Sequence, residues 1–252
     1  MASDVVTDRG RVRVEPSAKQ VRVMLGGVFV AETTRSLLVW EVPYFPTYYF
    51  PEDDVRTDLL EPTGEVRSSP SRGDATVFSV SVNGSQGTAY SYESPEIPEL
   101  KGHYAFVWDT MDHWFEENEE VFVHARNPYT RVEILPSGRH VRIEVDGVTV
   151  AESANASFLF ETGLPTRYYL PKTDVRMDLL TPTEKRTACP YKGNARYWSI
   201  TVDGETHENL VWAYDSPLPE SQGIAGLISF FNERVDVYVD GVLQDRPKTK
   251  FA

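Results

Sequence analysis

The chain has one cysteine, no long apolar run and few basic residues. With Cys189 alone among 252 residues it can form no internal disulfide, which is compatible with a reducing compartment. No apolar run reaches the ~18–20 residues that a membrane helix needs, and the first residues, MASDVVTDRG, lack the basic and apolar stretches of a signal peptide. The formal charge of −13 argues against nucleic-acid binding, which requires clustered Lys and Arg. We therefore expect an acidic, soluble, cytoplasmic protein with no nucleic-acid or membrane partner.

The most informative feature present is an internal repeat. Residues 48–63 read YYFPEDDVRTDLLEPT and residues 168–183 read YYLPKTDVRMDLLTPT, so eleven of sixteen pairs are identical at an offset of 120. The same offset relates an upstream GVFVAE segment to a later GVTVAE segment. A period of this length is a whole domain rather than a solenoid repeat. The sequence predicts two tandem domains, 1–126 and 127–252, each large enough to close its own core.

The local pattern is that of β-strands joined by tight turns. Alternating apolar residues flank Asp-Gly dipeptides at 146–147, 203–204 and 240–241, which is the strongest short-range signal for a hairpin. Long amphipathic helical stretches are missing. The sequence therefore predicts an all-β fold, with two tandem, duplicated antiparallel β domains and few short helices. The acidic run at 116–120 is expected to be a solvated turn.

Five blocks of the second half, in order along the chain, resemble domain-of-unknown-function family 427. They are Tyr-Tyr-x-Pro at 168–171, Asp-Val-Arg-x-Asp-Leu-Leu at 174–180, Cys-Pro-Tyr-Lys-Gly-x-Ala-x-Tyr-Trp at 189–198, Trp-x-Tyr-x-x-Pro at 212–217 and the segment 230–236. With the repeat, the resemblance covers nearly the whole chain in a tandem double-domain form. It implies a compact, tent-like antiparallel β domain and no particular reaction, since the family has no established general activity.

A nucleotidyltransferase label is sometimes attached to this family. Such an enzyme needs a Gly-Ser turn followed by paired carboxylates that hold Mg²⁺ against a triphosphate. The sequence has no Gly-Ser followed at a suitable distance by Asp-x-Asp. The motifs therefore do not support that activity in this chain.

The strongest chemical candidate is the CPYKG segment at 189–193. A thiol near a lysine can ionise to a nucleophilic thiolate at neutral pH, and Pro and Gly suggest a tight turn that presents Cys189, Tyr191 and Lys192 at one rim. The first copy reads SPSRG at the same place, without the thiol or the phenol. We therefore take these three residues as candidate catalytic groups and the first domain as a degenerate copy. Two alternatives stay open: Cys189 as a small packing residue, and Lys192 alone as an anion binder.

Two acidic residues are further candidates for acid–base chemistry. Glu161 follows an apolar run, where burial can favour the protonated carboxyl of a general acid. Asp174 precedes Arg176 in the repeated motif, and the same Asp and Arg stand in the first copy. We take Glu161 and Asp174 as candidate catalytic residues and Arg176 as a candidate ligand-binding residue. The alternatives are a buried Glu161 paired with an arginine and an Asp174 that caps a turn.

Aromatic residues of the second domain are numerous enough to line a flat pocket. The candidate ligand-binding rings are Tyr168, Tyr169, Trp198, Trp212 and Tyr214. Because most buried rings are core residues, only some of the five are expected to face a ligand.

These residues lead to three functional hypotheses. The first is an enzyme of small-molecule metabolism, of unknown reaction, with a pocket lined by the aromatics, Cys189, Lys192 and a carboxylate. The second is a non-catalytic module that binds a small ligand in the same pocket, and the third is a protein-interaction protein that uses edge strands or the acidic turn. The five histidines show no metal-ligand spacing, so no metal site and no cofactor are predicted. The oligomeric state stays open.

Overall fold

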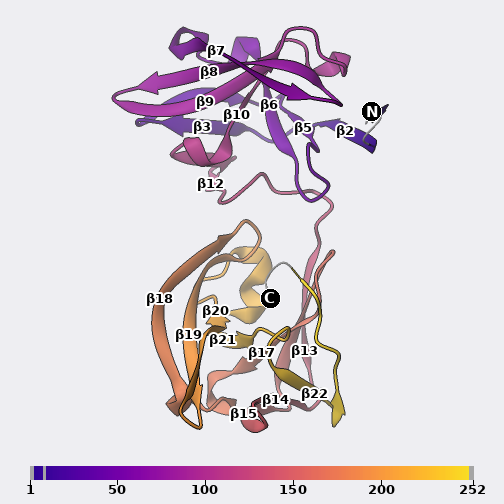
Figure 1. The fold of residues 1–252 in the computed structure, drawn as a ribbon, viewed down its shortest axis with the longest axis vertical. Coiled ribbons are helices and arrows are strands. Elements are labelled where there is room, and N and C mark those ends of the chain that lie inside the picture. The colour runs from indigo at the N-terminus through magenta and orange to yellow at the C-terminus, as the bar shows by residue number, and fades with distance from the viewer. Residues whose placement is uncertain (1–2, 8–9, 250–252) are drawn as a thin grey trace. The chain divides into compact units, whose positions relative to one another are not determined.

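The computed structural model describes residues 3–7 and 10–249, and the chain divides into two compact units, Met1–Asn127 and Pro128–Ala252. Both units are built from antiparallel strands with short 3₁₀ helices between them (Figure 1). The all-β class and the tandem duplication predicted from the sequence are confirmed. Among the helices of the described ranges, none is long and apolar enough to cross a membrane.

The first unit contains an eight-stranded and a four-stranded antiparallel sheet. In spatial order the large sheet consists of β1 (Ser3–Thr7), β2 (Gly10–Pro16), β5 (Leu37–Val39), β6 (Thr47–Pro51), β10 (His103–Phe106), β9 (Ser85–Tyr92), β8 (Gly73–Val82) and β7 (Leu60–Ser69). The small sheet consists of β12 (Glu119–Glu120), β11 (His113–Glu116), β3 (Val21–Leu25) and β4 (Val28–Thr33). The connections contain η1 (Glu52–Asp54), η2 (Thr57–Leu59), η3 (Pro98–Leu100) and η4 (Trp108–Thr110).

The second unit repeats this arrangement with a seven-stranded and a four-stranded sheet. The large sheet consists of β13 (Val132–Ser137), β16 (Ala156–Glu161), β17 (Arg167–Pro171), β21 (Leu227–Phe230), β20 (Glu205–Ala213), β19 (Gly193–Val202) and β18 (Leu180–Cys189). The small sheet consists of β15 (Val148–Ser153), β14 (Val141–Val145), β22 (Asp236–Val239) and β23 (Val242–Leu243). The connections contain η5 (Lys172–Asp174), η6 (Met177–Leu179) and η7 (Pro219–Ile224).

The Asp-Gly dipeptides form the hairpin turns of the second unit. Asp146 and Gly147 join β14 to β15 with φ angles of +51° and +80°. The dipeptides at 203–204 and 240–241 join β19 to β20 and β22 to β23 with similar φ angles, +48° and +85° in the first and +52° and +79° in the second. Two consecutive positive φ angles match the right-handed twist of the flanking strands, and Asp and Gly tolerate them best. The hairpin signals in the sequence are thus confirmed.

Alternation along the strands gives the large sheet of the second unit two different faces. On one face, side chains of β19, β20 and β21 pack against those of β14 and β22 in the core between the two sheets. On the opposite face, Tyr169 and Trp212 pack with Ile224 of η7. Because successive residues of a strand point to opposite faces, the neighbours Tyr168 and Tyr169 belong to different layers.

In the first unit the acidic run is only partly solvated. Glu116 ends β11 and is 4% exposed. Its carboxylate accepts hydrogen bonds from the Tyr48 hydroxyl (2.7 Å) and the Lys19 ammonium (2.5 Å). The turn itself begins at Glu117, which has a φ of +52°. The expectation of a solvated turn is therefore wrong for Glu116, whose buried charge Lys19 and Tyr48 stabilise.

Two tryptophans of the first unit stack on each other. The rings of Trp108, in η4, and Trp114, in β11, are 4.3 Å apart with an interplanar angle of 3°. The indole N–H of Trp114 also donates to the backbone carbonyl of Trp108 (3.2 Å). The stack thereby joins the 3₁₀ helix to the small sheet.

Candidate functional site

The turn that carries Lys192 joins β18 to β19. Cys189 ends β18 and pairs with Gly193, which begins β19 with a φ of +90°, in the region that favours glycine. The backbone N–H of Leu218, just before η7, donates to the carbonyl of Lys192 (3.2 Å). The CPYKG segment thus forms the expected tight turn, and the chain leading into η7 holds it in place.

Lys192 forms an ion pair with Glu161, the last residue of β16. The ammonium donates to Glu161 Oε2, and only 10% and 9% of the two side chains are exposed. Burying two charges is tolerated because each neutralises the other, and removal of one would leave its partner desolvated. The structure therefore brings two of the predicted catalytic residues into direct contact. Glu161 is buried and paired, as one alternative held, but its partner is a lysine.

An aromatic layer lies on the same face of the sheet. The indole N–H of Trp212 donates to the Tyr169 hydroxyl (3.0 Å), and the two rings meet edge to face at 6.2 Å. Phe231 packs on Trp212 at 4.5 Å and on Tyr197 at 6.4 Å. Tyr214 belongs to the same cluster. Three of the five predicted ligand-binding rings, Tyr169, Trp212 and Tyr214, are thus brought together.

The thiol of Cys189 packs against this layer. Cys189 is half-buried and free, and it contacts the cluster that contains Tyr169 and Tyr214. Burial raises the pKa of both phenols well above the ordinary tyrosine value, and the nearby Glu161 and Cys189 add to the rise. Both hydroxyls therefore stay protonated at neutral pH.

A second buried ion pair, which the sequence reasoning missed, supports the layer. Arg167 in β17 makes two hydrogen bonds of 2.6 Å to the Glu233 carboxylate and a third to Asn232 Oδ1. Its guanidinium lies 5.6 Å from the centre of the Trp212 ring. Bidentate geometry satisfies both charges internally. The Asn-Glu dipeptide falls in the family-like block at 230–236, which was the available signal, but nothing in the sequence paired it with Arg167.

Two predicted ring residues lie on the other face of the sheet. Tyr168 meets Phe158 edge to face at 4.9 Å, and Trp198 is covered by Arg196 at 4.5 Å, both at the core between the two sheets. Strand alternation separates them from Tyr169 and its neighbours. Tyr168 and Trp198 therefore do not join the Glu161–Lys192 group.

Asp174 and Arg176 also lie apart from this group. Asp174 accepts a hydrogen bond from Ser153 (2.6 Å), and Arg176 forms an exposed bidentate pair with Asp178 (2.9 and 2.7 Å). The first unit repeats both arrangements at the corresponding positions. Asp174 and Arg176 thus fix the 3₁₀ turns of the second unit, as Asp54 and Arg56 do in the first. Tyr191 is half-buried within the CPYKG turn, where its backbone carbonyl accepts a hydrogen bond (3.0 Å).

The first unit holds a related group around Glu41, the counterpart of Glu161. The hydroxyls of Tyr49 and Tyr90 donate to Glu41 Oε1 at 2.5 and 2.7 Å. Arg67 and Arg72 lie 3.3 and 3.4 Å from Oε2. Burial, together with the neighbouring Glu41, raises the pKa of Tyr49 and Tyr90 above the ordinary tyrosine value. Four side chains therefore saturate this carboxylate.

The group in the second unit is less saturated. Within the described part of the chain, Glu161 has Lys192 as its hydrogen-bond and ion-pair partner. The fully buried hydroxyl of Ser229 in β21 has no hydrogen-bond partner among residues 3–7 and 10–249. Ser229 stands directly opposite Tyr169 and Trp212 in the neighbouring strands, so it shares their face. The equivalent strand position in the first unit is Ala105, which needs no partner.

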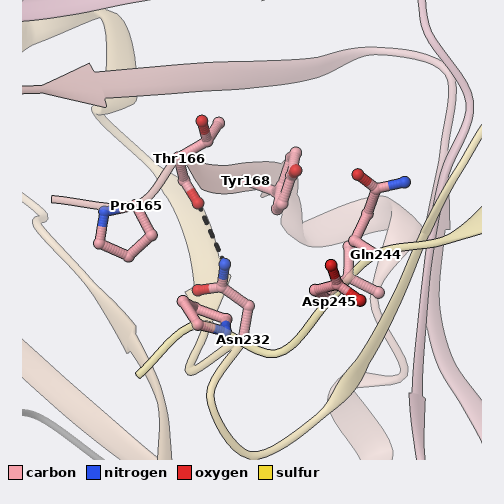
Figure 2. Close-up of a pocket in the computed structure, with 8 residues that line it drawn as sticks. Pro165, Thr166, Tyr168, Asn232, Gln244 and Asp245 are labelled. Atoms are coloured by element: carbon pink, nitrogen blue, oxygen red, sulfur yellow. Dashed lines mark hydrogen bonds between the residues drawn. The ribbon is translucent and has the colours of Figure 1, made fainter. Parts of the chain in front are cut away.

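A hollow of about 260 Å³ is lined in part by Asn232 (Figure 2), the residue whose Oδ1 accepts a hydrogen bond from Arg167. Tyr168, Gln244 and Asp245 line it, together with Thr166 and Asn232, whose amide donates to the Thr166 carbonyl (3.1 Å). Tyr168, a predicted ligand-binding residue, thus lines a different space from the Tyr169 layer.

Comparison with known families identifies the repeated unit. The profile of the family described as a domain of unknown function (DUF427) matches residues 13–117 and again residues 133–241. The comparison with curated proteins gives no match. The two matched regions fall in the two compact units, one in each. The chain therefore belongs to the DUF427 family, as a tandem pair of its domains.

Proposed function

We propose that the second unit is an enzyme of small-molecule metabolism whose site is the face that carries Glu161, Lys192, Cys189, Trp212 and Tyr214. The proposal depends on one observation, the difference in saturation between the two units. The carboxylate of the first unit has four partners, whereas Glu161 has Lys192 and lies on the same face as an unpaired buried hydroxyl. Polar groups without internal partners in an aromatic setting are what a bound ligand satisfies.

The roles follow from the chemistry of each group. Glu161 accepts a proton from the substrate and later returns it, while Lys192 neutralises the anion that the transfer creates. Tyr214, held protonated by burial, donates a hydrogen bond to a substrate oxygen. Trp212 offers a ring face against which a planar or apolar group can pack. Cys189 lies at the edge of this face and serves as a nucleophile or as a contact.

A location in the cytoplasm belongs to the same proposal. Cys189 is a free thiol in the structure, which is compatible with a reducing compartment. The formal charge of −13 disfavours nucleic acid as a partner, so the proposed partner is a small molecule.

Alkylation of Cys189 by iodoacetamide tests the proposal, because the chain has a single thiol. Pools of small metabolites are added to the full-length protein, and compounds that protect Cys189 are incubated with it and followed by mass spectrometry. We expect at least one protecting compound to be converted. In the Glu161→Gln variant the same compound should still protect Cys189 from alkylation, but the variant should convert the compound about 10²–10⁴-fold more slowly. The matched variant Glu41→Gln of the first unit should convert it at the wild-type rate.

Two results would overturn this assignment. Conversion that is unaffected by Glu161→Gln would remove the proposed proton acceptor. Protection of Cys189 without conversion of any compound would instead show a non-catalytic binding module. In such a module the Lys192→Met variant should lose ligand affinity and Cys189 protection together.

A further inference from the structure

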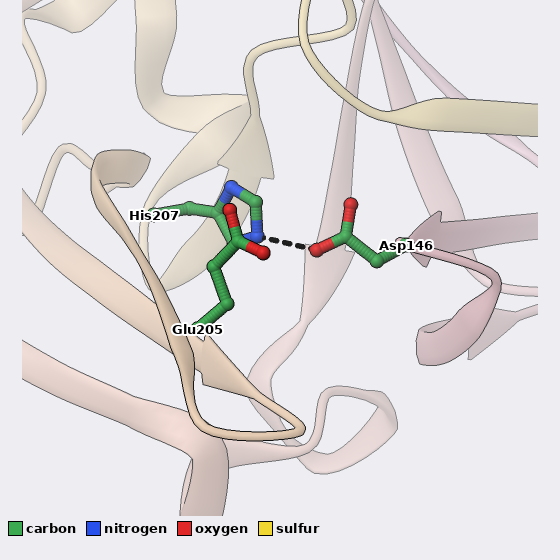
Figure 3. Close-up of side chains that lie close together, drawn as sticks. All are labelled: Asp146, Glu205 and His207. Atoms are coloured by element: carbon green, nitrogen blue, oxygen red, sulfur yellow. Dashed lines mark hydrogen bonds and ion pairs between the residues drawn. The ribbon is translucent and has the colours of Figure 1, made fainter.

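We propose that Asp146, Glu205 and His207 form a binding site for a first-row divalent metal ion, with Zn²⁺ as the preferred ion. One carboxylate oxygen from each acid and a ring nitrogen of the histidine lie within 4.8 Å of one another. Figure 3 shows the three side chains converging from two hairpins, with His207 Nε2 2.6 Å from Asp146 Oδ2. This site is separate from the Glu161–Lys192 group and independent of the function proposed for it.

The fold explains why the three residues meet. Glu205 and His207 are two residues apart at the start of β20, so they point to the same face. They pair with Val202 and Ile200, which belong to the core between the two sheets. Asp146 stands in the turn between β14 and β15 of the small sheet. The donors therefore gather at the rim where the two sheets meet.

The donor set favours a transition metal over Mg²⁺ or Ca²⁺. An imidazole nitrogen with two carboxylate oxygens suits Zn²⁺ and its first-row neighbours, whereas Mg²⁺ and Ca²⁺ prefer oxygen ligands alone. Zn²⁺ is bound by nitrogen and oxygen at about 2.0–2.2 Å, a spacing that small side-chain rotations reach from the present arrangement. Three protein ligands leave a fourth position for water or for another molecule.

The local charge favours a cation as well. Asp146 and Glu205 are exposed, and no Lys or Arg forms an ion pair with either of them in the described part of the chain. Two carboxylates held this close repel each other. A divalent ion between the three donors removes the repulsion at neutral pH.

The first unit provides an internal comparison, because all three donors are missing there together. Gly26, Ser85 and Gly87 occupy the corresponding positions. A Cβ at position 26 would lie 2.4 Å from the Val82 carbonyl oxygen, and one at position 87 would lie 2.3 Å from Met111 Cε. The chain itself therefore fills this rim in the first unit. The second unit has instead a rim with three donors, two of them exposed, which is the pattern expected if they act as a set.

Isothermal titration calorimetry of the full-length protein with ZnCl₂ tests the site. We expect one Zn²⁺ per chain, undisturbed by excess Mg²⁺, and a rise in melting temperature on addition of zinc. His207→Ala and Glu205→Gln should each weaken Zn²⁺ binding at least about tenfold. Because Glu205 is exposed, its substitution also serves as the test if the histidine variant fails to fold.

Two control variants separate this site from other zinc ligands. Cys189→Ser removes the only thiol, and His113→Ala removes a histidine of the first unit that contacts a single carboxylate, Glu120, at 2.6 Å. Both should bind Zn²⁺ as the wild type does. The proposal is wrong if the wild type binds no zinc, if Glu205→Gln and His207→Ala bind it unchanged, or if Cys189→Ser abolishes binding.

Discussion

Glu41 follows β5 by two residues and its counterpart Glu161 ends β16, yet the surroundings of the two carboxylates differ. Two tyrosines and two arginines enclose Glu41, while among the residues that the structure describes only Lys192 pairs with Glu161. Both units keep a buried carboxylate beside a cation, so this contact belongs to the fold. The units differ in whether other side chains of the protein occupy the remaining hydrogen-bonding positions of the carboxylate. We infer that the first unit devotes this position to stability and that the second keeps it free for a ligand.

The largest expected effect is the loss of the saturated carboxylate. Glu41→Ala leaves Arg72 buried without its ion-pair partner and two tyrosine hydroxyls without an acceptor. We expect the free energy of unfolding of the first unit to fall by about 3–5 kcal/mol. Hydrogen-exchange mass spectrometry of the full chain resolves the two units. Glu161→Ala in the second unit should cost less, and an equal loss in both would contradict the comparison.

The next effect is the pH dependence that Glu233 gives the stability of the second unit. Burial alone would raise the pKa of Glu233, but hydrogen bonds from Arg167 and Thr249 outweigh it and hold the pKa below its ordinary value of 4.5. The stability that Glu233 contributes is therefore fully present above pH 4.5 and is lost as the pH falls through the lower, folded-state pKa.

Glu233→Gln tests this dependence. At neutral pH it should lower the free energy of unfolding by roughly 1.5–3 kcal/mol, since a hydrogen bond to a charged group is lost. Denaturant melts at a series of pH values should show the difference from wild type shrinking below pH 4.5. A difference that stays constant with pH would mean that the Arg167 pair is not the cause.

A smaller effect is expected when the second unit is given the partners of the first. A triple variant can give Glu161 the residue types that surround Glu41. It combines Thr187→Arg, Lys192→Arg and Trp212→Tyr, which correspond to Arg67, Arg72 and Tyr90 of the first unit. If hydrogen-bonding capacity left unused around Glu161 distinguishes the units, the triple variant should be more stable than wild type by about 1 kcal/mol. An added hydrogen bond to the charged carboxylate contributes roughly 1.5–3 kcal/mol, and loss of the hydrogen bond from Trp212 to Tyr169 offsets about 0.5–1.5 kcal/mol of it. Protection of Cys189 by ligands should disappear at the same time. Retained protection would show that the ligand does not depend on this difference.

The smallest effect is expected where the units are the same. Arg56 with Asp58 and Arg176 with Asp178 form exposed bidentate pairs in both. The hydrogen bonds from the arginines lower the pKa of both aspartates. Asp58→Asn and Asp178→Asn should nevertheless leave the melting temperature unchanged, at low and at high salt, because exposed pairs contribute little. A measurable shift in one unit alone would break the equivalence.

The fold was predictable because its signals are local or repeated. The Asp-Gly turns and the 120-residue offset need no tertiary information. The candidate site was only partly predictable, because the pairing of the strands decides to which face of the sheet each side chain points. Nothing in the sequence separates Tyr168 from Tyr169, although only the second joins the aromatic layer beside Glu161 and Lys192. Likewise, the spacing of the histidines in the sequence indicates no metal site. The acidic neighbours of His207 are Asp146, from another hairpin turn, and Glu205, two residues earlier in the same strand.

The stacked indoles of Trp108 and Trp114 have a spectroscopic consequence. Two chromophores 4.3 Å apart couple their electronic transitions, so their near-ultraviolet absorption and circular dichroism bands change when unfolding separates the rings. Only the first unit contains this pair, since Trp198 and Trp212 of the second unit point to opposite faces of their sheet. The protein thus has a built-in optical reporter of one of its halves. Melting followed by these bands records that half alone, without added dye or label.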